Sequence, residues 1–168
     1  MLNISQVRKY IVKPSLEAID LYSPVAENLV VGTGLVESDF YSIRQNNIPE
    51  TGGLGIFQME IATAEWMWFE KLPKRHKARQ ILIMNFLFPW INDPNPFVFK
   101  TNDLKNLLTG NLFFGAMMCR MRYYVSSIPF PKDPNDIKTL SLYWKKIYNA
   151  STSPNARPAS DFVKKYNG

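Results

Sequence analysis

The segment from residue 111 to residue 126 is apolar on almost every side of a helix, and it constrains the fold more than any other part of the chain. Its sequence, NLFFGAMMCRMRYYVS, contains only two charged residues, Arg120 and Arg122. A helix that is apolar all round must lie inside the core of a protein. We therefore predict a buried helix here, with other helices packed around it in a mainly α fold.

Apolar periodicity, capping residues and prolines indicate the other helices. We expect them in an opening segment ended by Pro14, over residues 15–21, from Ser23-Pro24 to Glu37, over 62–72, 75–88 and 101–108, from Asp133-Pro134 to about 149, and from Ser160 onward. Residues 41–55 are predicted to be a loop with at most a short β ribbon, residues 92–96 a turn and residues 151–157 a linker.

Length and composition favour a single domain over residues 1–168. The formal net charge of +6 favours polyanionic partners, which include nucleic acid, anionic membranes and the bacterial cell wall. No arginine-rich run or nucleic-acid-binding signature is present, so we expect no nucleic-acid partner.

The chain contains one cysteine, Cys119, and one histidine, His76. One cysteine cannot form an internal disulfide, and this pair of residues makes a zinc site improbable. His76 stands in the basic run KRHK, which is typical of a solvated surface and not of a Ser-His-Asp triad. We therefore expect no metal and no cofactor.

No basic head followed by an apolar run opens the chain, so no secretory signal is expected. The longest apolar runs, such as residues 81–90, fall short of the ~20 residues that cross a bilayer, so no membrane span is expected. If the substrate lies outside the cytoplasm, a virion or a partner pore must deliver the protein.

Glu37 ends the helix predicted from Pro24, directly after the apolar residues Leu35 and Val36. Apolar surroundings disfavour the charged form of a carboxyl group, so its pKa rises and it can keep a proton at neutral pH. Such an acid is what a glycosidase needs, and the alternative is an ordinary exposed glutamate at a helix end. Gly32 and Gly34 weaken the same helix, and close packing of backbones would explain them.

Four motifs accompany this glutamate along the chain. They are Glu37-Ser38-Asp39-Phe40; Gly52-Gly53-Leu54-Gly55-Ile56-Phe57-Gln58 with Thr63-Ala64; Asn111 with Gly115; and Ile147-Tyr148-Asn149-Ala150. In this order they resemble the motifs of the soluble lytic transglycosylase and goose-type lysozyme superfamily, and their details look most like the small versions carried by tailed bacteriophages. The resemblance covers roughly residues 24–150, which leaves a linker and a short terminal helix in residues 151–168.

The resemblance implies a lysozyme-like domain that cleaves the β-1,4 bond between N-acetylmuramic acid and N-acetylglucosamine in peptidoglycan. In the lytic transglycosylases of this superfamily, one glutamate protonates the leaving oxygen and then takes the proton of the sugar's own hydroxyl. The product carries a 1,6-anhydro ring and no water is consumed. The resemblance gives this role to Glu37.

The same resemblance assigns supporting roles to three further residues. The amide of Gln58 is expected to bind a sugar, the hydroxyl of Tyr148 to reach toward Glu37, and Asn149 to fix the local turn. Tyr143 is a rival of Tyr148, because it stands five residues earlier in a similar aromatic setting. Without the resemblance, Tyr148 is more simply a core residue.

Two carboxylates leave the reaction type open. Glu60 is either a second catalytic carboxylate, which would favour water-mediated inversion, or a charge at the N-terminus of the following helix. Asp39 is a weaker candidate, because it is two residues from Glu37 and points elsewhere if the helix continues.

The leading hypothesis from sequence is a lytic transglycosylase, and the alternative in the same class is a hydrolytic muramidase. Two further hypotheses stay open, because a fold does not fix a function. They are a catalytically silent virion or wall-binding protein and a chitinase-type enzyme. The expected partner is the glycan strand of peptidoglycan, with other virion or tail proteins as candidates. The expected location is a phage virion or the host cell, with action at the periplasm or cell wall.

Overall fold

The computed structural model describes residues 2–41, 52–91, 99–150 and 156–168. Within these ranges the protein is mainly α, as the sequence predicted, and its β structure is one isolated bridge between Leu54 and Met59. Most of the predicted β-ribbon region, the turn at 92–96 and most of the linker at 151–157 lie outside the described residues.

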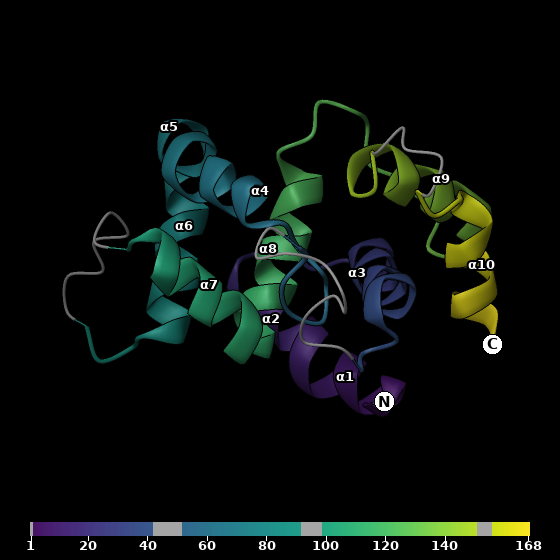
Figure 1. Ribbon diagram of the computed structural model, residues 1–168, viewed down its shortest axis with the longest axis horizontal. Coiled ribbons are helices and arrows are strands. Elements are labelled where there is room, and N and C mark those ends of the chain that lie inside the picture. Colours follow the sequence, from purple (N-terminus) through teal and green to yellow (C-terminus); the bar gives the residue numbers. More distant parts are fainter. Residues whose placement is uncertain (1, 42–51, 92–98, 151–155) are drawn as a thin grey trace.

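Figure 1 shows how the helices are arranged. In chain order they are α1 (Ile4–Val7), the π-helical segment η1 (Arg8–Val12), α2 (Lys13–Ala18), α3 (Pro24–Ser38), α4 (Ile61–Glu65), the π-helical segment η2 (Trp66–Lys71), α5 (Leu72–Arg75), α6 (Lys77–Leu87), α7 (Thr101–Gly110), α8 (Leu112–Tyr124), α9 (Ile137–Ile147) and α10 (Ala159–Asn167).

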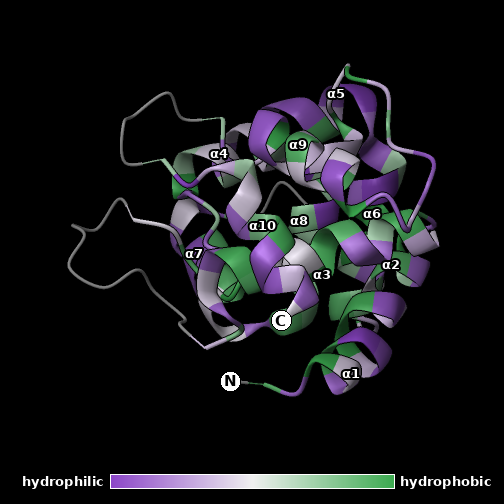
Figure 2. Ribbon diagram, turned by 90° about the vertical axis from the view of Figure 1, so that its right-hand side faces the viewer, coloured by the Kyte–Doolittle hydropathy of each residue, from purple (hydrophilic) through white to green (hydrophobic). Residues whose placement is uncertain are grey.

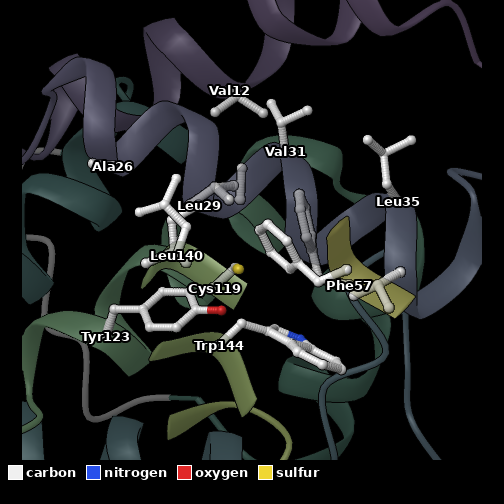
Figure 3. Close-up of a cluster of buried hydrophobic side chains, with 14 of the residues drawn as sticks. Val12, Ala26, Leu29, Val31, Leu35, Phe57, Cys119, Tyr123, Leu140 and Trp144 are labelled. Carbon is white, nitrogen blue, oxygen red and sulfur yellow. The ribbon is translucent and has the colours of Figure 1, made fainter. Parts of the chain in front are cut away.

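Helix α8 is the central buried helix that the sequence predicted. It runs between two groups of helices, with α4–α7 on one side and α3, α9 and α10 on the other (Figure 1). One face of α8 contributes Ala116, Cys119 and Tyr123 to a cluster shared with α3 and α9 (Figure 3). The opposite face contributes Phe114, Met117, Met118 and Met121 to a second cluster with α4–α7. Because both faces are covered, the segment has to be apolar all round.

Close packing explains two glycines of α3. A Cβ atom at Gly32 would lie 2.1 Å from the ring of Phe162 on α10, and one at Gly34 would lie 2.1 Å from the ring of Phe40. The absence of a side chain lets α10 lie directly on α3. Figure 2 shows both hydrophilic and hydrophobic residues on α10, as expected of a helix that covers a core with one face.

Two predicted helix boundaries are wrong. Pro14 does not end the opening helix, because the chain passes through η1 and Pro14 falls in the first turn of α2, where a missing N–H is tolerated. Helix α9 begins after Asp136, whose carboxylate accepts from the Thr139 N–H, and not at Asp133. Asp133 instead accepts a hydrogen bond from the backbone N–H of Asn135, in the turn before the helix.

None of the helices described is both long enough and apolar enough to cross a membrane.

Candidate functional site

Glu37 lies in the last turn of α3. The helix ends there because Asp39 and Phe40 both adopt positive φ angles, of 54° and 51°, which turn the chain away. Residues 29–36 are all buried, whereas the side chain of Glu37 is only partly covered. The apolar face of α3 therefore carries the carboxylate to the edge of the core.

Burial raises the pKa of Glu37 from 4.5 to about 7. The charges of Arg157 and Lys145 and a hydrogen bond from Trp144 act in the opposite direction, since each favours the carboxylate. The C-terminal end of α3 also disfavours a negative charge there. At neutral pH the group is therefore divided between its acid and base forms, as the sequence led us to expect for a proton donor.

A tight turn over residues 54–59 faces Glu37. Leu54 and Met59 exchange two backbone hydrogen bonds of 3.0 Å, and the backbone N–H of Gln58 donates to the carbonyl of Gly55. Gly55 has a φ of 68°, and a Cβ atom there would lie 2.1 Å from the carbonyl oxygen of Leu108. Position 55 therefore requires glycine, both for its backbone conformation and for its contact with α7.

Gln58 is held in a defined conformation within this turn. Its backbone φ is 48°, and its side-chain Nε2 donates to the carbonyl of Gly55 over 2.7 Å. Gln58 lines the same pocket as Glu37. The turn therefore presents the Gln58 amide in one orientation, as a polar contact for a ligand.

Two hydroxyl groups fasten the turn to the helices on either side. The hydroxyl of Ser38, next to Glu37, donates to the carbonyl of Ile56 over 2.6 Å. The hydroxyl of Tyr148 donates to the carbonyl of Phe57 over 2.8 Å. The turn is thus tied to the end of α3 by one bond and to the end of α9 by the other.

The contact found for Tyr148 differs from the one expected. Its hydroxyl was expected to reach toward Glu37, but it donates to the backbone of the turn. Burial, together with the nearby Cys119 and Glu37, raises the pKa of Tyr148 well above its ordinary value, so the hydroxyl stays a neutral donor. Tyr148 therefore positions the turn that carries Gln58.

Tyr143 does not line the Glu37 pocket. Its ring stacks on Tyr123, and its hydroxyl donates to the carbonyl of Ile128 over 3.2 Å. Five residues of helix separate Tyr143 from Tyr148, so the two hydroxyls leave α9 in different directions. The prediction that Tyr143 rivals Tyr148 at the site is therefore wrong.

The end of α9 supplies two further contacts. The indole Nε1 of Trp144 donates to Oε1 of Glu37 over 3.2 Å. The side-chain amide of Asn149 donates to the backbone carbonyl of Arg157 over 3.3 Å, and so fixes the chain that enters α10. Asn149 therefore contacts the chain just ahead of α10 and holds Arg157 beside the pocket, and the local turn that the resemblance assigns to it stays a prediction.

These segments enclose one pocket, which we call the Glu37 pocket, of ≈ 560 Å³. The residues that line it are Glu37, Gly53, Gln58, Met59, Glu60, Thr63, Arg122, Tyr148, Asn149, Ala150, Ala156 and Arg157. Three separated parts of the chain thus converge on Glu37, and five of the six predicted site residues are among the lining residues. This volume is typical of a small-ligand site.

Glu60 and Asp39 are placed differently. Glu60 is exposed, lines the Glu37 pocket and occupies the N-cap position of α4, without a capping hydrogen bond from its side chain. Both interpretations of Glu60 thus stay open. Asp39 accepts from Nζ of Lys165 over 2.6 Å and does not line the Glu37 pocket, so it faces α10, as its spacing from Glu37 suggested.

Sequence reasoning missed Trp144 and Arg157 as residues that act on Glu37. The spacing of Trp144 to Tyr148 is one helical turn, and that spacing could have placed Trp144 beside the site. No local signal marks Arg157, because its position depends on how α10 folds back onto α3.

Within the described part of the chain, no group of three or more His, Cys, Asp or Glu side chains is arranged to hold a metal ion. Comparisons with family models, with curated proteins and with solved structures found no match to this chain.

Proposed function

We propose that this protein is a peptidoglycan-cleaving glycosidase, and specifically a lytic transglycosylase that acts on the bond between N-acetylmuramic acid and N-acetylglucosamine. The observation that carries the proposal is Glu37, a carboxyl group with a pKa of about 7 in a pocket lined by four separated segments of the chain. The order of the four sequence motifs supports the same activity.

The electrostatics of Glu37 suit both steps of this reaction. A group with a pKa near neutrality can donate a proton to the leaving oxygen and then, as a carboxylate, accept one from the sugar hydroxyl. Trp144 donates to Oε1, so the acidic proton belongs on Oε2. After the first transfer, Arg157 and Lys145 favour the carboxylate through their charges. A single carboxylate therefore supplies the whole proton transfer.

The remaining pocket residues would bind the glycan. The amide of Gln58 is fixed by Gly55 and offers hydrogen bonds to the hydroxyl or acetamido groups of a sugar. The turn that bears it is held by Ser38 and Tyr148. Such supports keep a binding group within the small tolerance that catalysis needs.

A hydrolytic muramidase is the second candidate, and one observation favours it. Glu60 is exposed and lines the same pocket as Glu37, so it could orient a water molecule. Inverting glycosidases place their two carboxyl groups roughly 6.5–9.5 Å apart to leave room for this water. The transglycosylase is preferred because it requires no role for Glu60.

Mass spectrometry of the products from purified peptidoglycan tests the proposal. We expect products with 1,6-anhydromuramic ends from the wild type and a loss of at least roughly 10²-fold in Glu37→Gln, the lower end of the range for general acid catalysis. Reducing ends would indicate the muramidase instead. If the wild type released no glycan product while still binding the wall, the protein would be a silent wall-binding protein.

The proposed substrate lies outside the bacterial cytoplasm. We therefore propose that the protein acts at the periplasm or cell wall, from a phage virion or from the host cell, with virion or tail proteins as partners. Immunodetection of the protein in purified virions would test this placement.

A further inference from the structure

A second hollow, of ≈ 420 Å³, lies on the α10 side of Glu37. Its lining residues are Val36, Glu37, Ser38, Asp39, Arg157, Asp161, Lys164 and Lys165. Glu37 and Arg157 line both this hollow and the Glu37 pocket. A ligand bound in the Glu37 pocket can therefore extend a substituent into the second hollow, which we call the α10 hollow.

The wall formed by α10 is held firmly in place. Phe162 is fully buried against Gly32, and Lys165 forms a 2.6 Å ion pair with Asp39 at the end of α3. The hydroxyl of Tyr166 accepts a 2.7 Å hydrogen bond from Arg8. The helix thus packs on α3 and is also tied to η1 and to the residue that follows α3, so the α10 hollow is bounded by a fixed wall.

The charges around the α10 hollow leave two cations available. Lys165 is paired with Asp39, whereas Arg157 and Lys164 form no hydrogen bond or ion pair with any described residue through their side chains. Asp161, the other carboxylate on this wall, stands in the first turn of α10, where the helix dipole favours it. Among the described residues, the guanidinium of Arg157, whose charge also acts on Glu37, and the ammonium of Lys164 are therefore the cations of this hollow that can bind an anion.

We propose that the α10 hollow binds a carboxylate of the peptide branch carried by the glycan, so that the enzyme prefers peptide-substituted strands. This inference rests on the proposed function. In peptidoglycan the branch is attached to the muramic sugar, one of the two sugars joined by the bond that Glu37 would cleave. A branch that leaves this sugar beside Glu37 can enter the adjoining hollow.

The two cations suit such a group in different ways. Arg157 can bind a carboxylate through two parallel N–H donors, and its main chain is already fixed by Asn149. Lys164, on α10, adds the compact positive charge of its ammonium group to the same hollow. The hydroxyl and acetamido groups of a peptide-free glycan are neutral. Its one anion, the lactyl carboxylate that an amidase exposes on the muramic sugar, lies next to the ring and not along a branch, so we expect the two cations to favour strands that keep the peptide.

The test compares two substrates with two matched double variants. The substrates are glycan strands that keep their peptides and the same strands after an amidase has removed them. One variant is Arg157→Gln with Lys164→Gln. The control is Lys74→Gln with Arg75→Gln, which removes the same charges from exposed positions of α5, outside both hollows.

The measured quantity is the ratio of cleavage rates on peptide-bearing and peptide-free strands. Any effect of Arg157 on the pKa of Glu37 enters both rates and cancels in this ratio. We expect the ratio to fall by about 2- to 30-fold in the first variant, as two partly exposed ion pairs would give, and to stay unchanged in the control.

The outcomes separate this inference from the proposed function. Cleavage of both strands with an unaltered ratio in the first variant would overturn the inference and leave the glycosidase intact. A wild-type protein that cleaves neither strand would overturn both. As a second readout, binding of a soluble peptide-bearing disaccharide to Glu37→Gln should be weakened by the first double variant in titration calorimetry, and equal affinity would contradict a carboxylate site.

Discussion

The indole Nε1 of Trp144 lies 3.2 Å from Oε1 of Glu37, and this hydrogen bond joins a fully buried side chain of α9 to the end of α3. A buried indole N–H needs an acceptor, and the carboxylate supplies it. The bond favours the charged form of Glu37 while burial disfavours it. Trp144 thus helps to set both the orientation and the acidity of the candidate acid.

Replacing Trp144 by Phe removes this donor and keeps an aromatic side chain. We expect the pKa of Glu37 to rise above its value of about 7, because the carboxylate loses a hydrogen bond. Titration of the ¹³C-labelled Glu37 carboxyl by NMR measures this directly. Trp90→Phe, at an exposed position, is the control and should leave the titration unaltered. An unchanged pKa in Trp144→Phe would show that the bond has no electrostatic role.

Glu37 should also make the stability of the protein depend on pH. Its pKa is higher in the folded chain than in the unfolded chain, so its contribution to stability is complete below pH 4.5 and declines as the pH rises to about 7. Glu37→Gln lacks this titration. The variant should therefore gain stability relative to wild type between pH 4 and pH 8, by up to about 3 kcal/mol. Urea unfolding of both proteins at each pH checks this, and a constant difference would contradict the raised pKa.

Tyr148 and Tyr143 provide a matched pair of variants. Each hydroxyl donates to one backbone carbonyl, that of Phe57 for Tyr148 and that of Ile128 for Tyr143. Replacement by Phe should lower the free energy of unfolding by about 0.5–1.5 kcal/mol in both cases. Only Tyr148→Phe loosens the turn that bears Gln58, so only this variant should lose activity on peptidoglycan beyond its loss of stability. Equal activity in the two variants would argue against the positioning role.

The contact between α3 and α10 can be tested at Gly32. A methyl group there would lie 2.1 Å from the buried ring of Phe162, so Gly32→Ala should lower the free energy of unfolding by about 1–3 kcal/mol. Gly110 ends α7 with nothing within 4 Å of a Cβ atom, and Gly110→Ala should be neutral or slightly stabilising. Thermal unfolding compares the two, and equal melting temperatures would contradict tight packing of α10 on α3.

Glu60→Gln separates the two reaction types. In a lytic transglycosylase, Glu37 alone donates the proton to the leaving oxygen and accepts the proton of the sugar hydroxyl. Glu60→Gln should therefore keep most of its activity and still release products with 1,6-anhydromuramic ends. In an inverting hydrolase the same change removes the base, and cleavage should fall by roughly 10²–10⁴-fold. Mass spectrometry of the products and their rate of release decide between them.

The sequence was sufficient to predict much of the fold because its strongest signals are local. The apolar run of α8 and the Ser23-Pro24 cap of α3 each depend on neighbours along the chain. The two π-helical segments, Arg8–Val12 and Trp66–Lys71, were not predicted. Each directly precedes a helix with a proline in its first turn, where the missing N–H is tolerated, so the proline does not end the helical run.

The candidate site was predicted in part for a similar reason. Short sequence motifs identified three of the residues that line the pocket, namely Glu37, Gln58 and Asn149. The direction of the Tyr148 hydroxyl and the place of Arg157 depend on contacts between distant segments, which a single sequence does not specify.

The hydroxyl groups of Ser38 and Tyr148 donate hydrogen bonds to the backbone carbonyls of Ile56 and Phe57 in the 54–59 turn. The side chains of Ile56 and Phe57 take no part in these two bonds. A backbone carbonyl is present at these two positions whatever side chain they carry. Mutations at positions 56 and 57 that keep the packing volume therefore leave both bonds available. Positions 56 and 57 of such a turn can therefore change in sequence while its shape is kept, whereas position 55 cannot, because its backbone conformation and its contact with Leu108 require glycine.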